Sequence, residues 1–573
     1  MARRGGAIHV VTNRRAGTTG REYVTHLLRR TYREAGRVRN ETVGNISHLP
    51  EELVELIRRY LRGERFLSVE ESFEVEESLP HGHVEAALAM ARRLDLPRLL
   101  ERTPSRERSL VLAMLVERLL HPASKLATAR ALQASTLATE LGLEGADEDD
   151  LYRALDWLSE RQAAIERRLC RRHLRPGEHA LYDVSSSYFE GRCCPLAQLG
   201  YSRDRRRGSL QLVYGLLCDR HGRPLSPEVF PGGLHDDQTL PDRLQALRER
   251  FGLSRLVLIV DRGMVTEPNL EAIGQAGFAF ITALRAPQLK RLVKRGDLQL
   301  SLLDEQGLAE IASPDYPGER LVVCRNPLVG AERARKREAL LEATERELEA
   351  IQRRVEQGTL GGKAQIGLAV GAIWNRHRVR KHFRVEIEEE SLRFERREQE
   401  IAAEAALDGI YILRTSVPEL AAAEVVRSYK QLAQVERAHR ALKGPDLELR
   451  PIHHRLEQRV RAHVFVCSLA YYLEWHLRYA WRELLFADEH PPLAADPVAP
   501  RRRSAEAERK AQRKQTESGE PCHSWPTLLR HLSLRCRNTI RLVGSNAVFD
   551  KVTSLSPVQA RALELVQTVE LPP

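Results

Sequence analysis

Two aspartates lie within or directly after apolar, β-rich runs of the sequence. Asp183 interrupts the run Leu181–Val184, and Asp261 follows Leu256–Val260, the most apolar run in the chain. A carboxylate among apolar neighbours is costly to bury unless a partner or a metal ion compensates its charge. A strand-end aspartate can also simply form a turn. Each aspartate alone therefore leaves both interpretations open.

A third carboxylate lies on an expected helix that begins near Glu424. Tyr429, Glu436 and Lys443 recur there at intervals of seven residues, which places them on one face of a helix with about 3.6 residues per turn. A charged stripe of this kind is often only a solvated face. Together with the two aspartates, however, it offers three carboxylates, which suit hard divalent cations. Two such cations can promote phosphodiester displacement.

The elements around these residues predict a mixed α/β core that is divided in the sequence. Short β-rich runs begin near residue 178, alternate with helices, stop, and resume at the run DGIYILRTS. We expect a helical N-terminal region, the first part of the core, an α+β insertion with a charged helical hairpin or short coiled coil, the second part of the core, and a basic linker followed by a helical region. Their expected ranges are 1–175, 176–286, 287–408, 409–487 and 488–573.

The composition favours a polyanionic partner and argues against several other classes of protein. Lys and Arg outnumber Asp and Glu by 90 to 79, which gives a net charge of +11. The eight cysteines show no paired spacing, so neither a zinc knuckle nor a disulfide framework is indicated. No apolar run approaches the roughly 18 residues that a membrane span needs. We therefore expect a cytoplasmic protein that associates with the nucleoid and does not bind a membrane.

Five passages in this order resemble the successive blocks of the insertion-sequence type 4 transposases, and among these the type 1634 family. They are LYDVSSSYFE, GYSRDRR, VDRGM, YKQLAQVERAHRALK and RPIHHRLEQRVRAHVFVCSLA, within residues 181–470. The spacing Tyr429-x₆-Glu436-x₆-Lys443 matches the tyrosine, glutamate and lysine of the type 4 signature. The resemblance implies a DDE enzyme with an RNase H-like core.

The resemblance also implies the roles of individual residues. Asp183, Asp261 and Glu436 would bind Mg²⁺, which Mn²⁺ could replace, in a site for two ions. Tyr429 and Lys443 would contact DNA phosphate near the cleaved bond, and we extend this expectation to the basic residues Arg262 and Arg440. The implied activity is Mg²⁺-dependent cleavage at insertion-sequence ends followed by strand transfer into target DNA. The implied partners are double-stranded transposon ends, target DNA and a second copy of the chain.

The sequence departs from the type 4 signature at one position. The arginine expected three residues after the tyrosine is Leu432 here, and Arg437 or Arg440 could take its place. The frequent Gly-Asn of the family appears as Gly232-Gly233, and the aspartate that follows it in the family corresponds to Asp236. These differences leave the expected metal ligands unchanged.

Two basic stretches allow either a DNA contact or a solvated surface. One is the run Arg203–Arg207 after the first expected catalytic strand, and the other is the tract 501–514. The N-terminal region, whose first roughly 60 residues are rich in arginine, could order on DNA and bind the transposon ends.

Two other functions remain compatible with the sequence. One is a catalytically silent DNA-binding regulator, although a pure binder gains nothing from three acids beside DNA. The other is a structure-specific nuclease with the same core, which strand-transfer activity would distinguish from a transposase.

Overall fold

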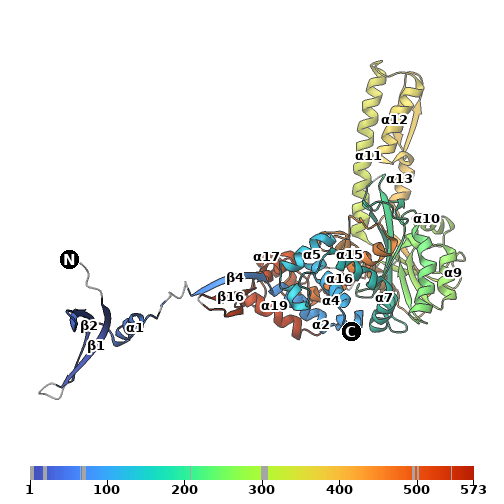
Figure 1. Cartoon of the computed structure of the whole chain (residues 1–573). Helices are drawn as coiled ribbons and strands as arrows, with labels where there is room; N and C mark the ends of the chain where they lie inside the picture. The colour runs from blue at the N-terminus through green and yellow to red at the C-terminus, as the bar shows by residue number, and fades with distance from the viewer. Residues whose placement is uncertain are drawn as a thin grey trace. The chain divides into compact units, whose positions relative to one another are not determined.

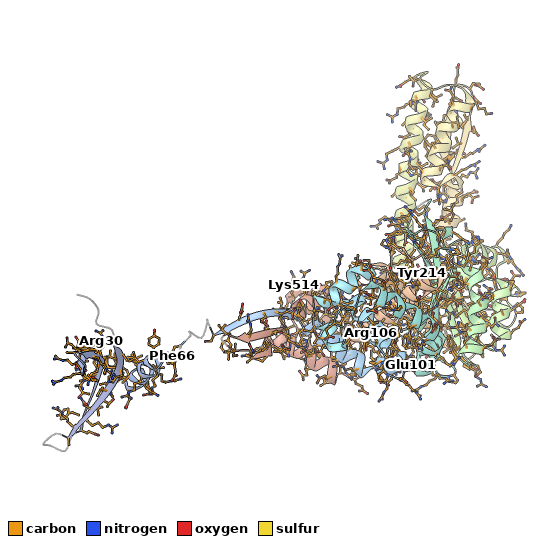
Figure 2. All side chains as sticks on the ribbon, in the orientation of Figure 1. Arg30, Phe66, Glu101, Arg106, Tyr214 and Lys514 are labelled. Atoms are coloured by element: carbon orange, nitrogen blue, oxygen red, sulfur yellow. The ribbon has the colours of Figure 1, made fainter. Side chains whose placement is uncertain are left out.

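The computed structural model describes residues 6–16, 22–64, 66, 72–206, 208–298, 303, 307–492, 497–499, 502–543 and 545–572. The chain divides into two compact units. One comprises Met1–Ser78 and Arg537–Val552, and the other comprises Leu79–Cys536 and Thr553–Pro573. Figure 1 shows both units coloured by residue number, and Figure 2 adds their side chains. Arg207 and Arg501, which belong to the two basic stretches, lie outside the described residues.

The first unit consists mainly of antiparallel strands. One sheet has the order β1-β2-β3, and α1 follows it in the chain; the other has the order β17-β16-β4. Their bounds are β1 (Ala7–Ala16), β2 (Glu22–Glu34), β3 (Arg37–Asn45), α1 (Glu51–Leu61), β4 (Phe73–Pro80), β16 (Cys536–Leu542) and β17 (Val548–Val552). The prediction of helix from residue 1 is therefore wrong for residues 7–45. Val, Thr and Tyr between the arginines favour extended pairing, and the density of arginine hid that pattern.

The expected helical region begins at Gly82 in the second unit. It contains α2 (Gly82–Arg93), α3 (Leu96–Leu100), α4 (Arg106–Leu120), α5 (Lys125–Gln133), α6 (Leu137–Leu141) and α7 (Glu148–His173). Helices α4 and α7 pack against α16 (Glu457–Ala480), which is buried over most of its length. A helix that is apolar on nearly all sides belongs in a core. These helices thus anchor the sheet that carries the expected catalytic residues.

The central sheet has the order of the expected RNase H-like core. Strands β5, β7 and β8 form an antiparallel meander, while β9 and β10 run parallel to β5, so the core order is β8-β7-β5-β9-β10. The sheet then continues through β15, β12 and β11, and β6 pairs with β7. The bounds are β5 (His179–Tyr188), β6 (Gln198–Leu199), β7 (Leu210–Asp219), β8 (Pro224–Pro231), β9 (Val257–Val260), β10 (Ala279–Ala283), β11 (Leu308–Ile311), β12 (Arg320–Arg325) and β15 (Ile410–Thr415).

Short helices connect these strands, and two more helices follow β15. The connecting helices are η1 (Asp236–Thr239), α8 (Leu240–Gln245), η2 (Ala246–Arg250), η3 (Arg262–Met264), α9 (Glu267–Gln275) and α10 (Ala286–Arg295). The expected continuous helix from Glu424 to Lys443 is instead two helices, α14 (Ala422–Lys430) and α15 (Leu432–Lys443), separated at Gln431. Gln431 itself keeps helical backbone angles. The break is therefore slight, and the heptad spacing did not reveal it.

The insertion is smaller than predicted. Strands β11 and β12, within the expected range 287–408, pair antiparallel with each other, and β12 pairs with β15, so both belong to the central sheet. The separate hydrophobic cluster begins only in α11. The insertion elements are α11 (Pro327–Glu356), α12 (Lys363–His377), η5 (Arg380–His382), β13 (Phe383–Ile387), β14 (Leu392–Arg396) and α13 (Glu398–Ala405). The apolar stripe of α11, formed by Leu341, Leu348, Ile351 and Val355, is buried in that cluster.

The last part of the chain returns to the helical region. It contains α17 (Ala505–Arg513), α18 (Trp525–Ser533) and α19 (Pro557–Thr568), and α18 and α19 pack against α2. Residues 488–573 also contribute β16 and β17, two strands that the expected linker and helical region did not include. Lys510 is buried, although its neighbours in the basic tract are mostly exposed. No helix in the described ranges combines the length and the apolar character that crossing a bilayer requires.

Candidate active site

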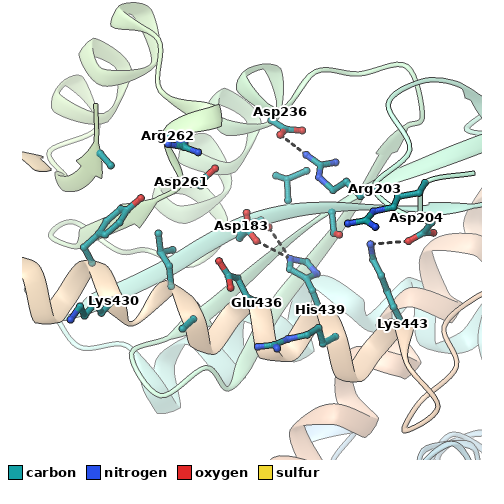
Figure 3. Close-up of a pocket in the computed structure, with 18 of the residues that line it drawn as sticks. Asp183, Arg203, Asp204, Asp236, Asp261, Arg262, Lys430, Glu436, His439 and Lys443 are labelled. Carbon is teal, nitrogen blue, oxygen red and sulfur yellow. Dashed lines mark hydrogen bonds and ion pairs between the residues drawn. The ribbon is translucent and has the colours of Figure 1, made fainter. Parts of the chain in front are cut away.

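One cavity of about 1080 Å³ brings together the three expected metal ligands and the four expected phosphate contacts (Figure 3). It lies beside the strand β5 and the helices α14 and α15. Its lining includes Asp183, Asp261, Glu436, Tyr429, Lys443, Arg262 and Arg440. Arg437, the other candidate for the missing signature arginine, is not part of the lining, and Leu432 is. Residues separated by up to 260 positions in the chain therefore share one site.

The pairing of β5 with β9 places the two aspartates side by side. These parallel strands align Tyr182 with Val260, and the next residue of each chain segment is Asp183 or Asp261. Asp261 ends its strand and accepts a hydrogen bond from the main-chain nitrogen of Gly263, at 3.3 Å. The carboxyl ends of parallel strands in open α/β sheets commonly carry ligand sites. The register thus accounts for the convergence of these two acids.

The helix α15 supplies the third carboxylate and packs on β5. Glu436 points toward the cavity, and His439, one turn later, lies beneath it (Figure 3). The Nε2 atom of His439 is 3.4 Å from the main-chain oxygen of Asp183 and 3.8 Å from its carboxylate. Burial lowers the pKa of His439 to about 3, and the positive charge of Lys443 adds to this effect. A neutral His439 therefore holds the strand to the helix without adding charge.

Burial and its acidic neighbours affect the protonation of Asp183. Burial raises the pKa of Asp183 to about 7, and the negative charges of Asp261 and Glu436 contribute to that rise. Burial, together with the same carboxylates, also raises the pKa of the Tyr429 phenol well above its ordinary value. Tyr429 therefore remains a neutral hydrogen-bond donor at physiological pH. A buried carboxylate with an elevated pKa marks a position where a cation would relieve electrostatic stress.

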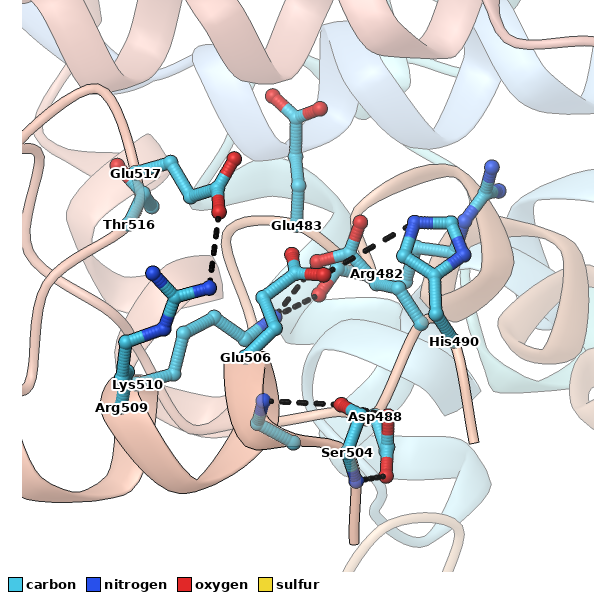
Figure 4. Close-up of polar contacts among 12 residues, drawn as sticks. Arg482, Glu483, Asp488, His490, Ser504, Glu506, Arg509, Lys510, Thr516 and Glu517 are labelled. Atoms are coloured by element: carbon cyan, nitrogen blue, oxygen red, sulfur yellow. Dashed lines mark hydrogen bonds and ion pairs between the residues drawn. The ribbon is translucent and has the colours of Figure 1, made fainter. Parts of the chain in front are cut away.

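The all-oxygen donor set of the triad fits a hard divalent cation. Its ligand atoms are not all within 4.8 Å of one another. In the described part of the chain, only Glu489, His490 and Glu506 bring three such ligand atoms that close together. In that second trio, the ammonium group of Lys510 already lies 2.7 Å from Glu489 (Figure 4). A cation already compensates its charge, so the triad remains the candidate metal site.

A group of charged residues that sequence reasoning missed closes one end of the cavity. Asp204 is buried, with its side chain 3% exposed, and forms ion pairs with Arg450 and with Lys443, the latter at 3.2 Å. It also accepts a hydrogen bond from the main-chain nitrogen of Tyr188, at 3.1 Å. Arg450 in turn donates to the main-chain oxygen of Lys443, at 3.2 Å. Lys443 is thus held in place and is not a freely solvated lysine.

A second ion pair lies beside this group (Figure 3). Arg203 and Asp236 form an ion pair between the loop after β6 and the short helix η1. The positive charge of Arg203 lowers the pKa of Asp183 and so opposes part of the effect of burial. The basic run that contains Arg203 therefore reaches the catalytic cavity, and its contact with DNA stays a prediction. The block GYSRDRR, which contains Arg203 and Asp204, was the only signal in the sequence for both pairs. It did not reveal which residues they pair with.

Replacing Asp183 by Asn should stabilise the free protein at alkaline pH. The folded-state pKa of about 7 lies above the ordinary value of 3.8, so the wild-type protein loses stability as the pH rises between these values. The Asn variant lacks this loss and, in EDTA at pH 8, should gain on the order of 2 kcal/mol in free energy of unfolding. Thermal melts at pH 4 and pH 8 test this. A difference between the two proteins that does not change with pH would contradict it.

The sheet order and the three acids define a DDE-type enzyme. The family models agree with that class: the model described as "Transposase DDE domain" matches residues 189–473, which include Asp261 and Glu436. The model described as "IS1634 family transposase, N-terminal domain" matches residues 8–72. The chain therefore belongs to the DDE transposases and is related to the IS1634 family, which confirms the resemblance seen in the sequence.

Other comparisons add little to this assignment. No curated protein matches the chain. Among solved structures, the chain is similar to the piggyBac transposase in a synaptic complex with hairpin DNA, with 9% identity, a TM-score of 0.33, and coverage of 79% of this chain and 76% of the other. The assignment depends on the family models, the sheet order and the site.

Proposed function

We propose that this transposase cuts DNA at the ends of its insertion sequence and joins the freed ends to target DNA in a Mg²⁺-dependent reaction. The observation that carries this proposal is the convergence of Asp183, Asp261 and Glu436 in one cavity. Eight Lys or Arg side chains and five carboxylates line that cavity. A surplus of cations around an acidic centre suits a phosphodiester backbone that approaches bound divalent ions.

The three acids would hold two Mg²⁺ ions, which Mn²⁺ could replace. Two such ions, when bound, activate the attacking oxygen and stabilise the leaving oxygen of a phosphodiester. Tyr429 and Lys443 would orient the phosphate that flanks the cleaved bond, the first as a neutral donor and the second as a cation fixed by Asp204. Arg262 and Arg440, on opposite elements of the cavity, would contact neighbouring phosphates.

The regions outside the core would position the DNA. We propose that the N-terminal part, which matches a transposase N-terminal domain, binds the element ends together with the helical region. The insertion contributes Arg333 of α11 to the lining of the catalytic cavity, so it would also reach the DNA near the cleaved bond. An insertion sequence has two ends, and each chain supplies one triad. The active complex would therefore be a homodimer on double-stranded DNA.

A cleavage assay tests the proposed function. Purified protein, DNA carrying the inverted repeats that flank the gene, and Mg²⁺ should give cleavage at the repeat ends and joined products with a target plasmid. EDTA should abolish both products, and Mn²⁺ should restore them. Cleavage without joining would favour the structure-specific nuclease. Binding without cleavage in either metal would favour the silent regulator.

A further inference from the structure

A second cavity beside the active site has an unusual excess of positive charge. Its volume is about 640 Å³, and it is lined by residues from α4, α5, α7 and α16 and by the segment that connects α15 to α16. Five Lys or Arg side chains line it, against a single carboxylate, Glu448. Two of the five, Arg450 and Arg459, pair with Asp204 and Asp156 outside the lining. Neither the triad nor the proposed phosphate contacts Tyr429, Lys443, Arg262 and Arg440 belong to this lining.

Lys125 is the most unusual residue of this second cavity. It is the first residue of α5 and is only 5% exposed. Among the described residues it forms no ion pair, and its strongest charged neighbour is another cation, Arg118. Burial, and secondarily Arg118, lower the pKa of Lys125 to about 7. A buried ammonium group without a carboxylate partner is strongly unfavourable in a protein that binds nothing there.

The neighbours of Lys125 do not supply the missing negative charge. Arg118 is 5% exposed and donates to the main-chain oxygen of Ala123, at 2.8 Å, but within the described part of the chain it has no carboxylate partner. Burial lowers the pKa of His454 to about 3, and Lys125 and Arg118 add to that effect. His454 is therefore neutral. The partial positive charge of the helix dipole at the start of α5 adds to the field.

Arg450 connects this cavity to the active site. Its side chain lines both cavities, and it pairs with Asp204, which also holds Lys443. A DNA strand that passes Lys443 would therefore meet Arg450 and then the second cavity. Compensation by an anion on the same strand would explain why a buried, unpaired lysine is placed here.

We propose that the second cavity binds a phosphate of the DNA backbone, on the DNA that continues from the cleaved bond, with Lys125 and Arg118 as its inner contacts. This inference rests on the proposed function, because it places the phosphate on the transposase's own DNA substrate. It adds a binding site in the helical region to the contacts within the core. Lys125 would therefore destabilise the unbound protein, and bound DNA would remove this destabilisation.

Lys125→Met should therefore have opposite effects on stability and on DNA binding. Removing an uncompensated buried charge should raise the melting temperature of the free protein. With a duplex carrying the flanking inverted repeat, affinity should fall roughly five- to tenfold, and the slope of log K against log salt should decrease by about 1, because one phosphate contact is lost. A lower melting temperature with an unchanged salt slope would show a structural lysine and overturn the proposal.

Lys510→Met is the matched control. Lys510 is also a buried lysine, 4% exposed, but it pairs with Glu489 and donates to the main-chain oxygen of Arg482. Its removal should lower the melting temperature and leave the salt slope unchanged. If Lys125→Met fails to fold, Arg455→Gln provides the same test, because Arg455 is exposed at the rim of the second cavity. An unchanged salt slope for Arg455→Gln would then overturn the proposal.

A phosphate scan decides between DNA and a free anion as the ligand. Methylphosphonates replace single charged phosphates of the duplex by neutral groups. One substitution should weaken wild-type binding but not weaken binding by Lys125→Met further, which is the signature of a direct pair in a double-mutant cycle. If inorganic phosphate stabilises the wild-type protein and no position in the scan is non-additive, the cavity takes free anions and the proposal fails. If the binding energies of the double-mutant cycle are non-additive but the protein does not cleave DNA, only the proposed function is refuted.

Discussion

Replacing Glu436 by Gln should reduce strand cleavage by at least a thousandfold, or about 4 kcal/mol at 1.36 kcal/mol per decade. Gln keeps the shape of the side chain but removes the charge that a divalent ion needs in an all-oxygen site. Asp183→Asn and Asp261→Asn should have effects of similar size. The measurement is the single-turnover rate on a pre-bound, end-labelled duplex in Mg²⁺.

Binding of the DNA ends should survive these substitutions. Affinity depends on cationic contacts with phosphate, and removing an acid beside the backbone lessens repulsion. The matched control is Glu424→Gln on α14, since Glu424 does not line the cavity and the variant should cleave at the wild-type rate. Cleavage by Glu436→Gln within tenfold of wild type would remove Glu436 from the active site.

Replacing Lys443 by Ala should slow cleavage by roughly ten- to a hundredfold, the range of a charge-assisted contact worth about 1 to 3 kcal/mol. The side chain of Lys443 is only 14% exposed and is held by Asp204, so its ammonium group is oriented before DNA arrives. Lys443→Arg should recover part of the rate. The rates are compared at saturating Mg²⁺ and low salt, where phosphate contacts contribute most.

Asp204→Asn separates positioning from direct contact. Asn keeps the hydrogen bond from Tyr188 but no longer pairs with Lys443 and Arg450, so the rate should fall although the cation at position 443 is intact. The control is Lys336→Ala, because Lys336 forms an exposed pair with Glu332 on α11 and lines neither cavity. Wild-type rates for both Lys443→Ala and Asp204→Asn would show that Lys443 has no role in cleavage.

The catalytic sheet could be predicted from the sequence because its signals are local. An apolar run such as Leu256–Val260 predicts a buried strand, and a carboxylate at its end predicts a site. The register between β5 and β9 then places Asp183 beside Asp261, although 78 residues separate them. The heptad spacing from Tyr429 to Lys443 predicted a shared face, and all three of its residues reach one cavity despite the break at Gln431.

The N-terminal sheet was missed for a physical reason. Strands β1 and β2 are only partly buried and β3 is largely exposed, so they lack the regular alternation of apolar and polar residues that marks a half-buried strand. Strands β11 and β12 were assigned to the insertion because their pairing with β15 joins segments that are distant in the sequence. Such non-local pairing leaves no signal in a single sequence.

The charged partners were missed because their significance depends on burial. Asp204 and Arg450 lie 246 positions apart and look like ordinary surface residues in the sequence. Lys125 stands at the start of a helix, where a lysine is usually solvated. Only the fold shows that Asp204 is buried between two cations and that Lys125 is buried without an anion.

The central claim is that Asp183, Asp261 and Glu436 together bind the divalent ions for cleavage. Anomalous scattering from crystals of the protein with end DNA and Mn²⁺ tests it most directly. We expect density within about 2.2 Å of carboxylate oxygens from all three residues, since oxygen ligands bind Mg²⁺ at about 2.1 Å and Mn²⁺ shares this ligand preference. Density only at Glu489, His490 and Glu506, or none near Asp183, would contradict the account.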